Sequence, residues 1–387
     1  MQEKLWTKDF VLLSMASFFM YLVFYCIMVV VAVYVLQQMA ASNAEAGLAA
    51  GDFLLAALIA RLFAGHSIER IGARRMMLWG LFLYGVVQGL YLIVPNVYLF
   101  MAVRFLHGGI FGFCATAVST LAAQLVPKSR QSEGMGYFLL STTLATAVGP
   151  FIGLYVYHNH GFSYLLMVSA GMAFLSFLLA KMIQPVAGAG QPVSRQTAAH
   201  GWSSYFEVKA LPIAMISFVI YFCYSSLLSF FSAYVSELDM MDEGQYFFIV
   251  YSLAIICSRP QVGKMADRKG ISCVMYPSFA CFALGLYFLS QMHTLGIMFL
   301  AAALCGFGFG TFAAMGQVIA IQKVPAERFG IALSTVLSIA ELGTGFGPFL
   351  LGGLIGVWGF HWLYRLAAVL VIFCGLAYYF CRKKNFI

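Results

Sequence analysis

The chain has 387 residues, of which 62% are apolar and 9% are charged, and its net charge is +8. Soluble domains hold about 45–50% apolar and about 25% charged residues, so this composition excludes an ordinary soluble protein. The apolar residues form runs of about 20 or more, long enough for a helix to cross about 30 Å of hydrocarbon. Because lipid offers the backbone no hydrogen-bond partners, spans this apolar are predicted to be helices.

Twelve such runs follow one another along the chain. They cover residues 10–36, 44–66, 75–94, 98–123, 134–157, 162–183, 210–236, 244–264, 272–291, 295–321, 330–356 and 361–381. An even number of spans places both termini on one side of the membrane, and the loops on that side hold most of the Lys and Arg residues. By the positive-inside rule, this side is cytoplasmic. Membrane topology thus accounts for the basic charge, and we expect no nucleic-acid partner.

A polar stretch rich in Gly, Ala, Ser, Gln and Pro separates the sixth span from the seventh. It divides the chain into a first bundle of six helices at 1–183, a cytoplasmic linker at 184–208 and a second bundle of six helices at 209–387. The bundles repeat each other at an offset of 198 residues. The matched positions include Gly72 and Gly270, Gly108 and Gly306, Gly149-Pro150 and Gly347-Pro348, and Gly161 and Gly359. Parallel repeats of this kind place a transporter's substrate site between them, near the bilayer midplane.

Two polar stretches in matching places, GHSIERIGARR and GKMADRKG, share the pattern G-x-x-x-[DE]-R-x-G. We interpret each as a short loop between helices, in which glycine allows a tight turn. The acid can pair with Arg or with the N-terminus of a neighbouring helix. The alternative is a solvated turn whose charges only set the topology. The residues of these two loops are Gly65, Glu69, Arg70, Gly72, Arg74, Arg75, Gly263, Asp267, Arg268 and Gly270.

Across its whole length the chain resembles the major facilitator superfamily. Residues 65–75 are similar to the signature of that family between spans two and three, and RFLHG at 104–108 resembles its R-x-x-Q-G motif, with His in place of Gln. AxxxGPxxG at 145–153 resembles the exporters' G-x-x-x-G-P-x-x-G signature, with Ala at the first position. The resemblance implies an all-α integral membrane fold of twelve transmembrane helices in two pseudo-symmetric six-helix bundles. It also implies that the two polar loops gate the cytoplasmic ends of the bundles.

Four polar residues within the spans are candidates for proton coupling: Asp52, Arg104, His107 and Glu341. A charge near the bilayer centre costs about 2.5–3.5 kcal/mol, so Arg104 should face the interior and have a partner. The first span contains no acid, whereas Asp52 on the second lies at a similar depth; we therefore expect these two to pair. Asp52 then either carries the coupling proton or forms a static ion pair. Glu341, in the middle of the eleventh span, either carries a proton, binds a cation or braces its helix.

Gly-Pro pairs within the fifth and eleventh spans each remove a backbone donor and permit a bend. The predicted hinge residues are Gly149, Pro150, Gly153, Gly347 and Pro348. The first and seventh spans are aromatic, and the resemblance implies that both line the central cavity. Their candidate substrate contacts are Tyr21, Phe24, Tyr25, Tyr221, Phe222 and Tyr224. A cavity with many aromatic groups and few charges suits an amphipathic substrate better than a strongly ionic one.

We expect a secondary active transporter in the plasma membrane, surrounded by lipid bilayer, that exchanges protons for a small amphipathic molecule by alternating access. The alternative is export or import of a polar metabolite, such as a sugar, an amino acid or an opine metallophore; a membrane sensor is a remote alternative. The sequence has no G-x-S-x-G, H-E-x-x-H or Walker motif, so we expect neither an enzyme, a cofactor nor ATP driving. Its nine cysteines show no metal-ligand spacing. Twelve spans suffice for a monomer, and a dimer remains an alternative.

Overall fold

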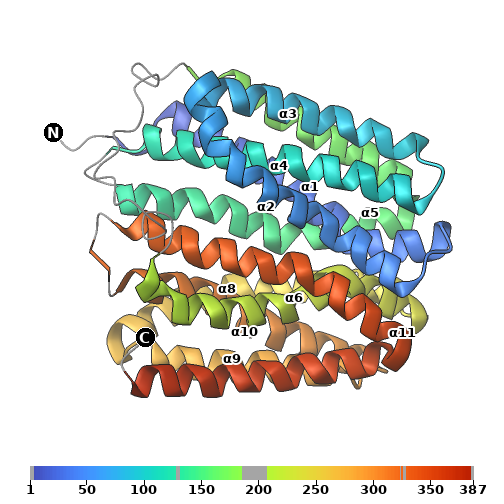
Figure 1. Cartoon of the computed structure of the whole chain (residues 1–387). Coiled ribbons are helices and arrows are strands. Elements are labelled where there is room, and N and C mark those ends of the chain that lie inside the picture. Colours follow the sequence, from blue (N-terminus) through green and yellow to red (C-terminus); the bar gives the residue numbers. More distant parts are fainter. Residues whose placement is uncertain (1–3, 128–130, 185–206, 323, 326–327, 385–387) are drawn as a thin grey trace. The chain divides into compact units, whose positions relative to one another are not determined.

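A computed structural model of the chain describes residues 4–127, 131–184, 207–322, 324–325 and 328–384, and Figure 1 shows its helices. No strand occurs among these residues. The helices are α1 (Lys8–Gln38), α2 (Asn43–Ile71), α3 (Ala73–Leu90), η1 (Tyr91–Ile93), α4 (Val97–Leu125), α5 (Gln131–Lys181), η4 (Val208–Ala210), α6 (Leu211–Glu237), α7 (Met241–Gly244), α8 (Phe247–Lys269), α9 (Ser272–Leu289), α10 (Leu295–Gln322) and α11 (Phe329–Lys383).

Within the described ranges, nine helices are long and apolar enough to cross a membrane, and the more charged α8 adds a tenth long helix. Two of them, α5 and α11, turn once within their length, at Gly161 and Gly359. Both glycines have positive φ, 81° and 76°, with ψ of 174° in each. This region of backbone space is essentially restricted to glycine. Counting α5 and α11 as two segments each gives the twelve helical segments that the sequence predicts.

Local sequence determines where several helices begin. Ser42 and Glu45 form a capping box before α2: the Ser42 amide donates to Glu45 Oε2 over 2.8 Å, and the Glu45 amide donates to Ser42 Oγ over 3.3 Å. Asn96 caps α4, where its Oδ1 accepts from the Leu99 amide over 2.9 Å. Thr7 caps α1 in the same way through Phe10. These side chains satisfy amides that have no partner within a helix.

The described chain divides into two compact units, here called unit 1 (Met1–Met39 and Asp52–Gln196) and unit 2 (Ala40–Gly51 and Thr197–Ile387). The predicted bundles differ from these units in the start of α2, which unit 2 includes. Most of the predicted linker, residues 185–206, lies outside the described residues. The boundaries expected at 183 and 209 therefore stay a prediction.

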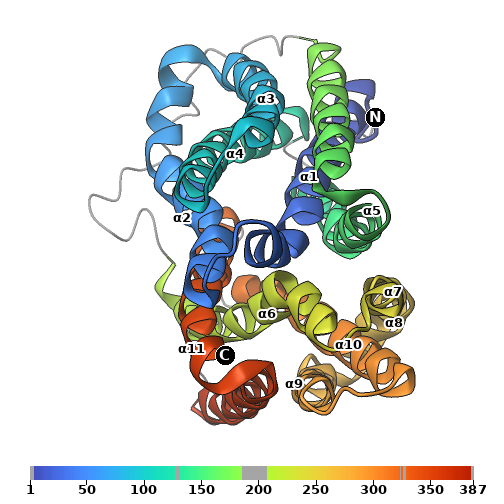
Figure 2. The same ribbon diagram turned by 90° about the vertical axis from the view of Figure 1, so that its right-hand side faces the viewer.

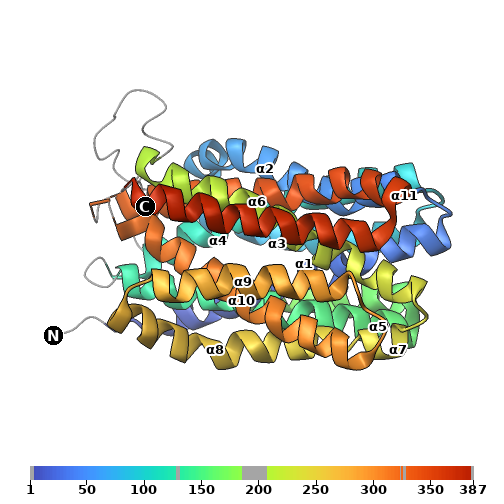
Figure 3. The ribbon, with the colours of Figure 1, turned by 90° about the horizontal axis from the view of Figure 1, so that it is seen from below.

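The same helix pairs form inside each unit. In unit 1, α1 packs on α5, and α3 packs on α4 (Figures 1 and 2). In unit 2, α6 packs on α11, and α9 packs on α10 (Figures 2 and 3). These are the pairings that two copies of one arrangement require, because α6, α9, α10 and α11 are the repeats of α1, α3, α4 and α5. The repeat detected in the sequence is thus also a repeat of the three-dimensional packing.

Candidate functional site

A buried ion pair joins α2 to α4 within unit 1. Arg104 Nε lies 3.3 Å from Asp52 Oδ1, and their side chains are 2% and 12% exposed, respectively. The guanidinium also contacts the Met28 sulfur at 3.7 Å and lies 5.3 Å from the centre of the Phe53 ring. A buried cation is tolerated only with partners of this kind, because losing water costs several kcal/mol. The pairing expected from the sequence is present, whereas its role in proton coupling is not tested by the geometry.

Close packing of α4 on α2 brings the two charges together. Gly108, one turn after Arg104, lies against the carbonyl oxygen of Phe53, the residue after Asp52. Gly112 lies in the same way against the carbonyl oxygen of Ala57. A Cβ atom at either glycine would overlap the backbone of α2. The two small residues, four apart on α4, let the helix backbones approach as small-xxx-small faces do.

An aromatic and imidazole group lies beside this ion pair. The Tyr91 hydroxyl, from η1, lies 3.2 Å from His107 Nδ1, and the Arg104 side chain lies close to Tyr91. Both Tyr91 and His107 are almost completely buried, at 2% and 1% exposure. Among the described residues, His107 Nε2 and Asp52 Oδ2 are buried without a hydrogen-bond partner. The site is thus a connected row of polar groups that runs from Asp52 through Arg104 and Tyr91 to His107.

Unit 2 provides an internal comparison for this site. Gly306 packs against the carbonyl oxygen of Tyr251, as Gly108 packs against that of Phe53, and these residues match at the repeat offset. The positions that match Asp52, Tyr91, Arg104 and His107 are Val250, Leu289, Ala302 and Cys305. Unit 1 therefore has polar residues at these four positions, whereas unit 2 has three apolar residues and one cysteine at the matching positions. The helix packing itself does not require the polar group.

Glu341, the other predicted coupling acid, is half-buried on α11 in unit 2. Glu341 belongs to unit 2 and the Asp52–Arg104 pair to unit 1. Among the described residues, no three His, Cys, Asp or Glu side chains gather in a way that could hold a metal ion. Asp52 and Glu341 both stay candidates for proton coupling, each to be tested on its own.

The predicted gating loops are largely helical, which corrects the interpretation of both as loops. Helix α2 continues to Ile71 and α8 to Lys269, because no residue before the final glycine breaks either helix. Only Gly72 and Gly270 leave the helix, with φ of 85° and 86°. Each amide still bonds to the carbonyl four residues earlier, on Ile68 and Ala266. The break between helices is thus one residue long in unit 1, at Gly72, and two residues long in unit 2, at Gly270 and Ile271.

The remaining residues of the two stretches differ in their surroundings. Arg74 donates from Nε to the Ile183 carbonyl over 3.1 Å and so binds the end of α5. A cation is favourable there because the last carbonyls of a helix carry partial negative charge. Arg70, Arg75 and Arg268 are exposed, and a Cβ at Gly65 or Gly263 would meet open space. The side chains of Glu69 and Asp267 lie outside the described part of the structure.

The predicted hinge glycines lie at close helix contacts. Within unit 1, Gly149 faces the Tyr25 side chain and Gly153 faces the Cys26 carbonyl oxygen, both on α1. Within unit 2, Gly347 faces Ser225 of α6. Pro150 and Pro348 lie inside α5 and α11, whose turns come later, at Gly161 and Gly359. These glycines bring helices together in the described conformation, and bending at the Gly-Pro pairs stays a prediction.

The predicted cavity aromatics fall into two groups by exposure. Phe24 and Tyr224 are buried, and each stacks within its own unit: Phe24 on Phe53 at 5.1 Å between ring centres and Tyr224 on Phe309 at 3.8 Å. Half-buried side chains make up the second group, namely Tyr21, Tyr25, Tyr221 and Phe222. The half-buried group keeps some exposed surface, whereas Phe24 and Tyr224 pack within their units, and substrate contact by any of the six stays a prediction.

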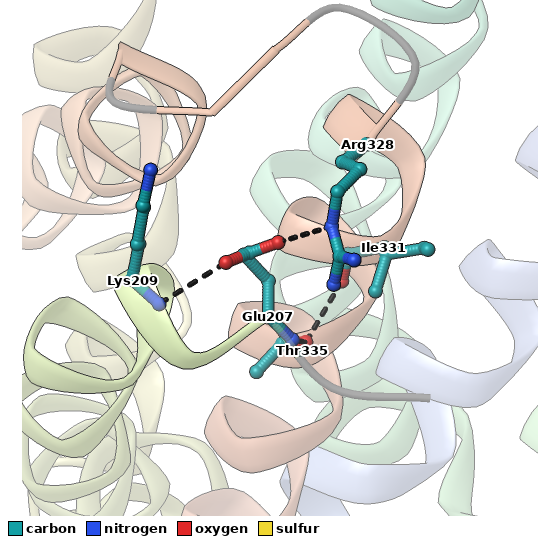
Figure 4. Close-up of polar contacts among 5 residues, drawn as sticks. All are labelled: Glu207, Lys209, Arg328, Ile331 and Thr335. Atoms are coloured by element: carbon teal, nitrogen blue, oxygen red, sulfur yellow. Dashed lines mark hydrogen bonds and ion pairs between the residues drawn. The ribbon is translucent and has the colours of Figure 1, made fainter. Parts of the chain in front are cut away.

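A second buried carboxylate, which the sequence analysis did not single out, lies directly before η4, the short turn that leads into α6 in unit 2 (Figure 4). Glu207 is 6% exposed and lies 2.5 Å from Arg328 Nε through Oε2. Its Oε1 accepts from the Lys209 amide over 3.2 Å, and its own amide donates to Thr335 Oγ1 over 3.0 Å. This cluster ties the start of α6 to the start of α11. Arg328 had been visible in the sequence only as a basic loop residue.

Sequence reasoning also missed Tyr91 and Met28. Tyr91 follows Tyr84 and Gln88 on one helical face, and this polar row in an apolar span is the one signal that could have identified it. Met28 carried no signal, because methionine in a span is an ordinary apolar residue. Its contact with Arg104 depends on helix packing that the sequence alone does not specify.

Comparison with known proteins identifies the family. The family model of the Major Facilitator Superfamily matches residues 13–273 and 241–385. Multidrug resistance protein MdtG of Yersinia enterocolitica is 24% identical over 355 residues, which cover 89% of this chain and 84% of MdtG. The multi-drug resistance efflux pump PmrA of Streptococcus pneumoniae is 25% identical over 343 residues, covering 86% and 84%.

Solved structures show the same fold at lower identity. The nucleoside transporter NupG superposes with a TM-score of 0.74 at 13% identity, covering 97% of this chain and 100% of NupG. A bacterial homolog to the human lysosomal transporter Spinster gives 0.77 at 11% identity, covering 97% and 96%. With the family model matching most of the chain, this protein belongs to the Major Facilitator Superfamily and is a multi-pass membrane transporter, not an enzyme.

Proposed function

We propose that this protein is a proton-coupled antiporter that exports small amphipathic molecules, with Asp52 as the proton-coupling carboxylate and Arg104 as its partner. The observation that carries the proposal is the buried Asp52–Arg104 ion pair, which unit 2 replaces by Val250 and Ala302 at the matching positions. Charges inside a membrane are costly and mark ion pathways when they are retained. Since the repeat packs without them, the charges of unit 1 have a use other than folding.

The chemistry follows from the charge on Asp52. An ionised carboxylate attracts the guanidinium strongly in a medium of low dielectric constant, and protonation removes most of that attraction. Arg104 then needs another partner, or the helices that hold the two groups must rearrange. Proton binding and release at Asp52 thereby change the relative stability of two arrangements of α2 and α4. A substrate that binds one arrangement better than the other completes the coupling.

Two observations favour amphipathic cargo and export. The half-buried aromatics of α1 and α6 offer apolar surface with hydroxyl groups, which suits molecules of mixed polarity. The relatives MdtG and PmrA are named as multidrug resistance and efflux proteins, and each aligns with more than four-fifths of this chain. We further propose that both termini face the cytoplasm, since the basic loops lie on their side of the plasma membrane. In this topology Arg74, Gly72 and Gly270 belong to the cytoplasmic gate.

The test uses the purified full chain in liposomes loaded with ethidium as an amphipathic cation, with a pH gradient imposed in either direction. Wild type should move ethidium against its gradient when protons flow the other way. Asp52→Asn should abolish this pH-driven movement while ethidium binding persists. Asp239→Asn, an isosteric change at an exposed acid, is the matched control. Unchanged pH-driven transport in Asp52→Asn would reject the role of Asp52. A loss confined to Glu341→Gln would move the coupling site to α11.

A further inference from the structure

Asp52 is not the only residue that positions Arg104. The geometry points to Tyr91 and His107 as further positioning residues for its guanidinium. We propose that His107 is uncharged, carries its proton on Nε2 and accepts the Tyr91 hydroxyl proton at Nδ1. Tyr91 in turn offers its oxygen to Arg104. The role in transport rests on the proposed function, whereas the hydrogen-bond arrangement does not. His107 in this arrangement orients its neighbours and does not itself carry the coupling proton.

The direction of each hydrogen bond follows from what the groups can donate. A guanidinium has only donors, so in the proposed bond between Arg104 and the neighbouring Tyr91 the phenol oxygen accepts. The phenol hydrogen is then free for its other neighbour, His107 Nδ1, at 3.2 Å. An Nδ1 that accepts this hydrogen carries none of its own. We assign the single hydrogen of the neutral imidazole to Nε2, because this tautomer uses the phenol hydrogen, whereas an Nδ1–H would compete with Arg104 for the phenol oxygen.

The surroundings of His107 favour the neutral ring. The residue is 1% exposed, and its ring lies 4.3 Å from the Tyr84 ring and 5.4 Å from the Phe53 ring, measured between ring centres. An imidazolium in this aromatic enclosure would lose its hydration and would stand beside the cation of Arg104, on the same helix face. Both effects oppose a second positive charge.

The ionisable groups that face Arg104 come from every helix around it. They are Asp52 from α2, Tyr84 from α3, Tyr91 from η1 and His107 from α4; Cys26 of α1 and Cys114 of α4 lie near Tyr84. Asp52 is the one carboxylate in this set. In the proposed arrangement the coupling proton therefore belongs to Asp52, while the Tyr91–His107 pair keeps one arrangement.

The matching residues of unit 2 separate this role from a folding role. Leu289 and Cys305 stand where Tyr91 and His107 stand in unit 1, next to Ala302, which has no guanidinium to orient. The phenol and imidazole are therefore present where the arginine is present and absent where it is absent. This pairing is expected of residues that serve Arg104 and is not required by the packing of α9 on α10.

Nitrogen-15 NMR of the full chain, labelled at histidine and reconstituted in lipid, tests the arrangement directly. The chain has seven histidines, and the signals missing in His107→Asn identify those of His107. We expect an unprotonated Nδ1 and a protonated Nε2 between pH 6 and 8, and a shift of the Nδ1 signal in Tyr91→Phe. A doubly protonated ring within this range, or a proton on Nδ1, would overturn the proposed arrangement.

Transport variants test the positioning role. Tyr91→Phe and His107→Leu should each lower pH-driven ethidium efflux about tenfold, the effect of losing one hydrogen bond to a charged group. Their double variant should be no worse than either single variant, because both act through the same guanidinium. His107→Asn should restore efflux to within about twofold of wild type, since the Asn side-chain oxygen can take the place of Nδ1. His160→Leu, at an exposed histidine of the same unit, is the control.

The outcomes separate the two proposals. If wild type shows no pH-driven efflux while the NMR signals match the expected tautomer, the antiporter proposal fails and the arrangement around Arg104 stands. If wild type transports but His107→Asn is as impaired as His107→Leu, or the two losses multiply in the double variant, the positioning role is wrong. Melting temperatures of all variants in detergent identify any that lose efflux through misfolding, and for those the NMR result decides.

Discussion

Gly108 of α4 lies directly against the carbonyl oxygen of Phe53 in α2, so close that a Cβ atom would overlap it. Gly306 lies in the same way against the carbonyl oxygen of Tyr251, at a repeat offset of 198 residues. In unit 1 this contact adjoins an ion pair, since Asp52 precedes Phe53 and Arg104 lies one turn before Gly108. In unit 2 it adjoins apolar residues. The close spacing of these helices is thus common to both repeats, whereas the ion pair between them is present only at the contact in unit 1.

Gly108→Ala should separate the two helices and weaken the Asp52–Arg104 contact. The added methyl group must displace backbone, which is costly in a packed interior, and overpacking of this kind destabilises proteins by about 1–3 kcal/mol. Gly306→Ala adds the same atom at the matching contact and is the control. We expect both variants to melt at lower temperature and only Gly108→Ala to lose pH-driven efflux beyond the loss of folded protein. Equal efflux per folded molecule in the two variants would contradict this link.

Replacing the ion pair by the residues of the other repeat should spare the fold and abolish coupling. Removing one partner of a buried pair leaves an unpaired charge and costs about 3–5 kcal/mol, whereas replacing both by apolar residues is often neutral. We therefore expect Arg104→Ala to melt well below wild type and Asp52→Val/Arg104→Ala to recover most of that loss. Neither should support pH-driven efflux. Thermal unfolding followed by tryptophan fluorescence, together with the efflux assay, measures both effects. A double variant less stable than Arg104→Ala would contradict the argument.

The helical segments and the repeat could be predicted because apolar run length and glycine placement are properties of the sequence itself. The Asp52–Arg104 contact could also be predicted, since a buried cation needs an acid and the first span has none. Tyr91 could not, because its hydroxyl reaches His107 only through the short η1 turn after α3. The helical course of 65–71 was missed because Gly65 and the charged residues resemble a loop. Glu207 and Arg328 are 121 residues apart, and no local pattern records such a contact.

Gly161 and Gly359 should be equally intolerant of a side chain. Their φ values of 81° and 76°, with ψ of 174°, lie where other residues are strained by about 1–3 kcal/mol. No neighbouring atom lies within 4 Å of a Cβ at Gly161 or at Gly359, so the cost is one of backbone conformation and not of space. Gly161→Ala and Gly359→Ala should lower the melting temperature by similar amounts. Gly171→Ala, in the regular part of α5 with open space around it, should leave the melting temperature unchanged or raise it.

Glu207→Gln should loosen the junction between α6 and α11, because the carboxylate holds Arg328 and the Lys209 amide together (Figure 4). Gln keeps the shape and one acceptor but loses the charge, and a hydrogen bond to a charged group contributes about 1.5–3 kcal/mol. Arg328 is one-third exposed, so solvent screening places the expected loss at the lower end of that range. The same substitution at the exposed Glu237 should have almost no effect.

A double-mutant cycle measures the interaction between the two side chains. It compares the thermal melting of Glu207→Gln, Arg328→Gln and Glu207→Gln/Arg328→Gln, with Glu237→Gln as the control. Losses that simply add would show that the two side chains do not stabilise each other, and the link between α6 and α11 would then rest on the bond from the Glu207 amide to Thr335.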